Sequence, residues 1–148
     1  NPYRFKITGR TKHHINVFGE ELVIENAETA LADVSKAHQT SVIDFTAGPV
    51  FMDGNKKGKH EWIVEFKSPP KDFDQFMNDL DKRLQELNSD YEAKRYKNMT
   101  LDSLDMHIGR ENLFHDWLKD RNKLGGQNKI PRLSNSREFV DVLLKMNR

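Results

Sequence analysis

The spacing of hydrophobic positions changes along the chain, and each change marks a predicted element. Residues 3–8 alternate apolar with polar positions, the two-residue period of a half-buried strand, and residues 13–17 and 21–24 are short strand-like runs. The second and third runs flank Phe18 and Gly19, which predicts a β-hairpin with glycine in its turn. Apolar residues then follow helical spacing over 27–37, which predicts a helix capped by Asn26 that ends near residue 38.

The middle of the chain predicts a helix, two strands, a helix and a strand. Pro49 suggests an edge strand or a bulge, with an interruption near Gly48-Pro49. In the next strand Trp62, Val64 and Phe66 should share one face and Ile63 the other. The elements that follow the first helix are expected as strands over 42–52, 61–66 and 101–108, and as helices over 72–87, 111–121 and after a Ser134–Ser136 cap.

This order predicts an α+β fold. The α-β-β-α-β run suggests a small mixed or antiparallel sheet of split-βαβ type with helices packed on one face, plus the N-terminal β-hairpin. Such folds host many functions, so the fold class alone does not assign one.

Composition narrows the class of protein. The chain has 148 residues, enough for one domain, and nine Phe and two Trp supply a core. No stretch approaches the roughly 18 apolar residues of a membrane span, and the net charge of +1 gives no field that would attract nucleic acid. The absence of Cys excludes disulfides and fits the cytoplasm. We therefore expect a cytoplasmic domain with no nucleic-acid or membrane partner.

Two segments contain candidate chemistry, and each also has a plainer interpretation. From composition alone the plainer interpretation is favoured for both. Residues 9–22 would then be a turn and hairpin with solvated Arg10 and Lys12, and residues 125–132 would be a solvated linker. However, Lys129 follows a glycine loop and could reach a neighbouring site as a point charge, a role in which lysine binds phosphate well. None of the six histidines has metal-ligand spacing, so no metal site is expected in this chain.

Taken together, the two segments resemble adenylate-forming enzymes. The residues that match the hinge motif of that superfamily are Gly9, Arg10, Lys12, Ile15, Gly19 and Leu22. The stretch 126–132, Gly-Gln-Asn-Lys-Ile-Pro-Arg, looks like the Gly-Gln-x-Lys-x-Pro-Arg signature of the auxin-responsive acyl acid amido synthetases. Phe45 and Phe114 also lie in contexts similar to that family. The chain therefore resembles the C-terminal domain of a bacterial relative of these enzymes.

The resemblance implies a domain division and a set of site residues. Residues 1–12 would be the hinge and the end of a missing N-terminal adenylation domain, and residues 13–148 the C-terminal lid. Lys129 would be catalytic and Gly9, Arg10 and Lys12 would form the hinge. The loop that approaches the nucleotide would contain Gly125, Gly126, Gln127, Pro131 and Arg132, and Arg132 would hold either this loop or a phosphate. Phe18, Gly19 and Glu20 would lie on the hairpin that faces the acyl acceptor.

The resemblance also implies the reaction. ATP and Mg²⁺, held mainly by the N-terminal domain, would convert a carboxylic acid to an acyl-adenylate, and an amine, typically of an amino acid, would then take the acyl group. The isolated chain is expected to be inactive. The alternative is a non-catalytic split-βαβ module with a regulatory or nucleic-acid-binding role. A parent that makes acyl-CoA or only an acyl-adenylate is a third possibility.

Overall fold

The computed structural model describes residues 14–17, 19–98, 100–120 and 129–148. Its helices are α1 (Ile24–Ala37), α2 (Phe73–Leu87), α3 (Ser89–Arg95), α4 (Leu113–Asp120) and α5 (Glu138–Met146), with a short 3₁₀ turn η2 (Tyr96–Asn98) after α3. Its strands are β1 (His14–Ile15), β2 (Leu22–Val23), β3 (Ser41–Val50), β4 (Lys59–Ser68) and β5 (Asp105–Gly109). The strand predicted over residues 3–8 lies outside the described residues.

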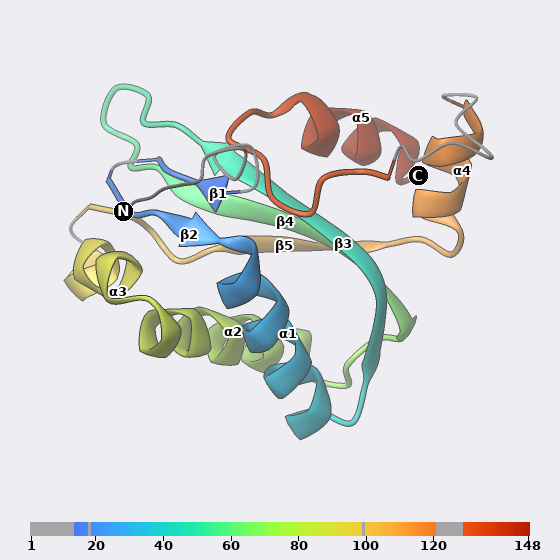
Figure 1. Cartoon of the computed structure of the whole chain (residues 1–148), viewed down its shortest axis with the longest axis horizontal. Helices are drawn as coiled ribbons and strands as arrows, with labels where there is room; N and C mark the ends of the chain where they lie inside the picture. The colour runs from blue at the N-terminus through green and yellow to red at the C-terminus, as the bar shows by residue number, and fades with distance from the viewer. Residues whose placement is uncertain (1–13, 18, 99, 121–128) are drawn as a thin grey trace, which may run out of the picture.

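The described strands form two sheets (Figure 1). β1 and β2 pair antiparallel as the expected hairpin. The larger sheet has the order β3-β4-β5, in which β3 pairs antiparallel with β4, and β4 pairs parallel with β5. The sheet is therefore mixed and the fold is α+β, as the element order predicted. β4 and β5 are direct neighbours, so the helical connection between them is an unsplit βαβ unit, and the split arrangement expected from the sequence is not formed in this sheet.

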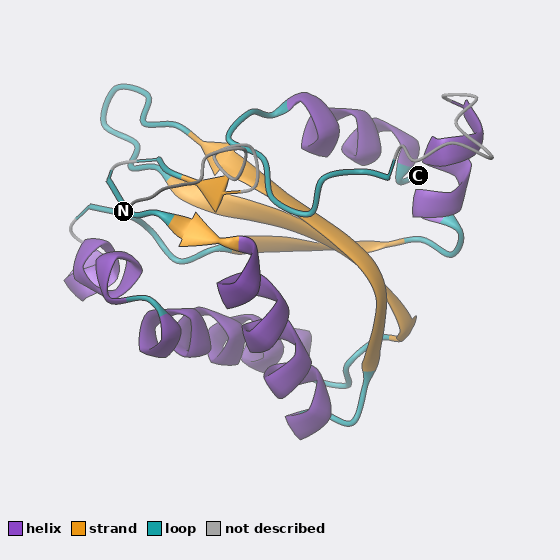
Figure 2. Ribbon diagram, viewed as in Figure 1, coloured by secondary structure: helices purple, strands orange, loops and turns teal. Residues whose placement is uncertain are grey.

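Helices cover both faces of the larger sheet (Figure 2). α1 and α2 lie against one face, and α4 and α5 lie against the other. The expectation of helices on a single face is wrong, because strand β4 is apolar on both sides. Trp62, Val64 and Phe66 enter the larger core with α1 and α2, whereas Ile63 enters a second core with α4 and α5. The predicted division of these four side chains between two faces is confirmed.

Three features of the secondary structure differ from the sequence-based expectation. β3 runs without a break through Gly48 and Pro49, and its register shifts instead lie between Ser41 and Asp44. Pro49 is tolerated there because β3 is an edge strand, as expected. α1 begins at Ile24, so Asn26 is in its first turn, where its side chain accepts a hydrogen bond from the Val23 amide at 3.2 Å. Residues 89–95 form helix α3, which was not predicted because the segment is polar.

No helix in the described part of the chain is both long and apolar enough to cross a membrane. Helices α1, α2, α4 and α5 are amphipathic, and each buries one apolar stripe. In α2 the buried apolar positions are Phe76, Leu80 and Leu84, which recur at helical spacing, and Asp72 caps the helix by accepting from the Gln75 amide at 3.0 Å.

Candidate functional site

The backbone that follows Lys129 is fixed to the outer edge of β3. The Ala47 amide donates to the Arg132 carbonyl at 2.9 Å, and the Ser134 amide donates to the Ala47 carbonyl at 3.2 Å. The buried hydroxyl of Thr46 donates to the Pro131 carbonyl at 2.6 Å. Residues 131–134 therefore extend the edge of the sheet with a parallel bridge between Ala47 and Leu133.

Lys129 lies two residues before this fixed segment, and its side chain is exposed. It borders a cleft of about 570 Å³ between the start of α1, β3 and α4, lined by Ile24, Ile43, Asp44, Phe114, Trp117, Leu118 and residues 129–132. Among the described residues, the Lys129 ammonium has no hydrogen-bond or ion-pair partner. A cation placed in this way can interact with an anion that enters the cleft.

Arg132 differs from Lys129 in that its charge is already engaged. Its Nη1 donates to Glu28 on α1 at 2.6 Å, and its Nε contacts the Asp44 carboxylate on β3 at 3.4 Å. The guanidinium also lies over the Phe45 ring, with Cζ 5.2 Å from the ring centroid. The side chain thus joins the segment 131–134 to both α1 and β3.

Phe114, one of the residues that supported the family resemblance, lies at the start of α4 and is buried in the wall of the cleft. Glu65, a buried acid on β4, accepts from the Asn112 amide at 2.8 Å and from the Phe114 amide at 3.2 Å. A carboxylate at this position satisfies donors that a helix N-terminus leaves free. It therefore fixes the helix that forms one side of the cleft.

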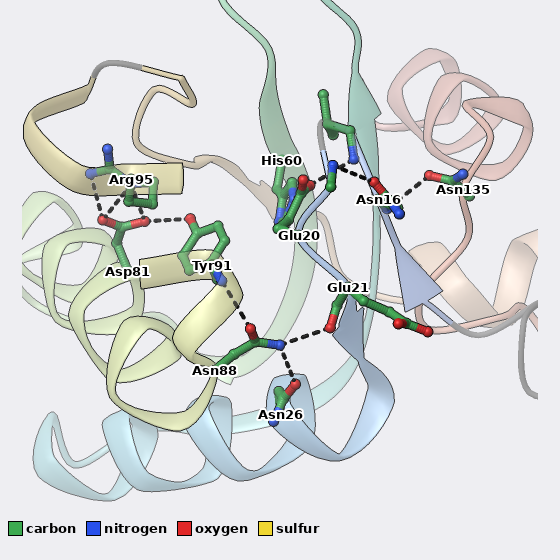
Figure 3. Close-up of polar contacts among 12 residues, drawn as sticks. Asn16, Glu20, Glu21, Asn26, His60, Asp81, Asn88, Tyr91, Arg95 and Asn135 are labelled. Atoms are coloured by element: carbon green, nitrogen blue, oxygen red, sulfur yellow. Dashed lines mark hydrogen bonds and ion pairs between the residues drawn. The ribbon is translucent and has the colours of Figure 1, made fainter. Parts of the chain in front are cut away.

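Two residues of the predicted site, Gly19 and Glu20, are described in the hairpin, and of these two only Gly19 is exposed. Figure 3 shows the contacts of Glu20. Gly19 is exposed with φ of 97°, and its amide donates to the Asn16 side chain at 2.7 Å. Glu20 is fully buried: one carboxylate oxygen lies 2.7 Å from His60 Nε2 and accepts from the Val17 amide at 2.7 Å. Gly19 is thus available on the surface, whereas Glu20 holds the turn from below and does not face solvent.

His60 connects this turn to a second buried group. Its ring lies 5.1 Å from the Tyr91 ring of α3, and the Tyr91 hydroxyl donates to Asp81 of α2 at 2.5 Å. Arg95 pairs with the same carboxylate at 2.7 Å (Figure 3). Burial, together with the Asp81 charge, raises the pKa of Tyr91 well above its usual value. Tyr91 therefore remains a neutral hydrogen-bond donor throughout the neutral pH range.

Seven of the residues predicted for the site lie outside the described residues: Gly9, Arg10, Lys12, Phe18, Gly125, Gly126 and Gln127. The structure brings Lys129, Pro131 and Arg132 together at one cleft and places Gly19 and Glu20 in the hairpin. Glu28, Asp44 and Thr46, which fix the lysine segment, were not predicted from the sequence. Their contacts with that segment span 85 or more positions along the chain, so no local pattern could have indicated them.

Comparison with known proteins identifies the class. Residues 25–138 match the model of the GH3 family C-terminal domain, so the chain belongs to the GH3 family and represents its C-terminal domain. No curated protein matches the sequence.

Two solved structures have a similar fold. One is a "GH3.15 acyl acid amido synthetase", with a TM-score of 0.69 and 17% identity, and the other is "AtGH3.15 acyl acid amido synthetase in complex with 2,4-DB", with a TM-score of 0.68 and 15% identity. Each similarity covers 92% of this chain and 26% of the other. The chain therefore spans about a quarter of the length of these structures.

Proposed function

We propose that this chain is the lid of an ATP-dependent acyl acid amido synthetase. The observation that carries the proposal is the match of residues 25–138 to the GH3 family C-terminal domain. The position of Lys129 supports it, because an exposed cation without a described partner borders an open cleft at the end of a fixed segment. The partner of the lid would be an N-terminal adenylation domain of the same protein, joined through a hinge at residues 9–12.

In the first step the carboxylate of an acyl acid attacks the α-phosphorus of ATP and pyrophosphate leaves. Negative charge accumulates on the oxygens around phosphorus, and a preorganised cation lowers the barrier by stabilising it. Lys129 supplies that cation when the lid closes, and closure also excludes water that would hydrolyse the acyl-adenylate. Lysine suits this role because its ammonium is a compact point charge on a flexible stem.

In the second step an amine, typically of an amino acid, attacks the acyl carbon and AMP leaves. We infer that the lid turns between the two steps, so that Lys129 moves away and the β1–β2 hairpin approaches the acyl-adenylate. Gly19 is the described residue of this turn that is open to the surface. A Cβ at this position would lie 3.2 Å from Cε of Lys94, so an incoming amine would approach beside the flexible end of that side chain.

The residues present are consistent with ATP as a substrate that is held mainly by another domain. Lys129 would contact the α-phosphate and the acyl carboxylate, and Arg132 is engaged by two acids. Mg²⁺ would accompany ATP and be held mainly by the N-terminal domain, because it is usually bound through one or two carboxylates together with substrate phosphates. Within the described residues no group of three or more His, Asp or Glu could hold a metal ion.

The experiment that tests the proposal is ATP–pyrophosphate exchange by the full-length enzyme over a panel of carboxylic acids. We expect acid-dependent exchange that falls about 10²- to 10³-fold in Lys129→Ala, by analogy with other preorganised charge groups. Lys82→Ala, which removes an exposed lysine of α2, should exchange like the wild type. Amines added to the wild type should then give an amide and AMP.

The outcomes separate the alternatives. Exchange unaffected by Lys129→Ala would keep the enzyme class and reject the role of the lysine. Exchange followed by transfer to coenzyme A alone would reject the amide-forming step. An absence of exchange with every acid would reject adenylation of the acids in the panel and favour a non-catalytic module.

A further inference from the structure

Lys129 itself makes no described contact that would fix its position, so other groups must position its backbone. The segment 131–134 has three hydrogen bonds to β3, at Ala47 and Thr46. These bonds fix the segment along the strand but do not connect it to α1, the element that forms one side of the cleft. The Arg132 side chain makes that connection.

The contacts of Arg132 come from three directions. Glu28 of α1 accepts from Nη1 at 2.6 Å, Asp44 of β3 lies 3.4 Å from Nε, and the Phe45 ring lies under the guanidinium. Two carboxylates face one guanidinium, so the net formal charge of these three groups is negative. The Asp44 carboxylate is itself oriented, because it accepts from the Phe45 amide at 2.8 Å.

From these contacts we infer that Arg132 is a positioning residue, and that Glu28 and Asp44 are the anchors through which it holds Lys129 at the cleft. We call the three residues Arg132, Glu28 and Asp44 the arginine clasp. The inference rests on the proposed function, since it assigns Arg132 to the loop that carries the catalytic lysine and not to a phosphate of the nucleotide. Two carboxylates beside the guanidinium lower the positive potential that a phosphate would meet there.

The two possible roles of Arg132 predict opposite effects of the anchors. If Arg132 positions Lys129, removal of the Glu28 and Asp44 charges loosens the segment and slows adenylation. If Arg132 binds phosphate, the same changes release the guanidinium and leave adenylation unchanged or faster. Neither anchor needs to touch the substrate for this comparison to work.

The test uses ATP–pyrophosphate exchange by the full-length enzyme. The variants are Arg132→Met, Arg132→Lys and Glu28→Gln/Asp44→Asn, with Glu92→Gln as a control for removal of an exposed carboxylate on α3. Asn at position 44 keeps an oxygen that can accept from the Phe45 amide. We expect kcat for exchange to fall about 10- to 10²-fold in Arg132→Met, the scale of a displaced catalytic group, with the KM for ATP changed less than twofold.

The clasp residues are exposed enough for solvent to weaken their ion pairs, so the anchor double variant should lose less, about three- to tenfold in kcat. Arg132→Lys keeps the charge but loses the fork that reaches both acids, so it should fall between the wild type and Arg132→Met. An anchor double variant with wild-type or higher kcat, or an Arg132→Met variant changed mainly in KM for ATP, overturns the inference.

A second measurement does not depend on catalysis. The Ala47 amide donates to the Arg132 carbonyl, so its hydrogen exchange reports whether the segment remains on β3. In the clasp variants the Ala47 amide should exchange at least several-fold faster, while amides in the centre of β4 stay protected. Unchanged protection of Ala47 in Arg132→Met overturns the clasp. If the wild type shows no acid-dependent exchange, or Lys129→Ala has no effect, the proposed function fails whatever the Ala47 amide shows.

Discussion

At the scale of single residues, the pair of Glu20 and His60 places two polar side chains in the interior of the domain. Both side chains have no exposed surface, and their polar atoms lie 2.7 Å apart. Charged or polar groups removed from water in this way require partners, and the loss of one partner leaves the other uncompensated. The same carboxylate accepts from the Val17 amide, so the pair also determines the shape of the hairpin turn.

We predict that Glu20→Ala destabilises the domain by about 1–3 kcal/mol, the usual cost of leaving buried hydrogen-bonding groups without their partner. Urea unfolding followed by circular dichroism measures the change. Glu21→Gln, which alters an exposed acid one position further on, should stay within about 0.5 kcal/mol of the wild type. A loss below 1 kcal/mol in Glu20→Ala would show that the pair does not determine the hairpin.

A second prediction concerns Tyr91, whose pKa is raised by burial and by Asp81. Its folded pKa lies above the unfolded value near 10, so the folded state is penalised when pH rises above about 10. Stability should be insensitive to this group below pH 9 and should fall above pH 10. Tyr91→Phe removes the alkaline loss from this group, and at pH 7 costs about 1–3 kcal/mol because Asp81 loses a donor. Parallel urea titrations at pH 7, 9 and 10.5 would check it, and equal alkaline slopes in both proteins would contradict it.

The sequence predicted the roles of residues that depend on near neighbours in the chain. It did not predict the roles of residues whose partners are distant in the chain. Gly19 could be assigned to a turn because only a few adjacent positions decide it, and its φ of 97° confirms that prediction. His60, the partner of Glu20, lies 40 positions away along the chain, so the sequence indicated that Glu20 belongs to the hairpin but not that it is buried. Lys129 was identified by a motif and its role stays a prediction.

At the scale of elements, alternation and helical spacing predicted the principal helices and strands. Helix α3 was not predicted, although the residue before it, Asn88, is a typical N-cap residue. Its side chain accepts a hydrogen bond from the Tyr91 amide at 2.9 Å. The distribution of helices over two faces could not be predicted from period alone. It depends on which face of β4 each helix covers, and both faces of that strand are apolar.

The N-terminus of α4 provides a prediction at this scale. Glu65→Leu removes the acceptor of two backbone amides in a buried place, at Asn112 and Phe114. We expect a loss of about 1–3 kcal/mol and faster amide exchange in the first turn of α4. Lys67→Ala, an exposed position of the same strand, serves as control. Retained protection at the Phe114 amide would show that Glu65 does not fix the helix.

At the scale of the whole molecule, the two cores share the strand β4 and are expected to unfold together. The chain has two tryptophans, and the structure places Trp62 in the larger core and Trp117 in the smaller one. Each can therefore report on one core by fluorescence.

We predict that Leu143→Ala, a substitution in the smaller core, lowers stability by about 2–5 kcal/mol as seen by both tryptophans. The measurement is urea unfolding of Trp62→Phe and Trp117→Phe proteins, each with and without Leu143→Ala. Within each pair the substitution should shift the transition by the same free energy. A shift seen only by Trp117 would show that the faces unfold separately.

The attachment of residues 131–134 to β3 has a consequence for solubility. β3 is an edge strand, and an uncovered edge offers backbone groups on which another chain can add a strand. The segment that follows Lys129 occupies part of that edge at Ala47, where it takes up both backbone groups. Substitutions that release the segment should therefore displace Lys129 and also expose an edge on which another chain can pair. The same stretch of chain would then position the lysine and protect the domain against self-association.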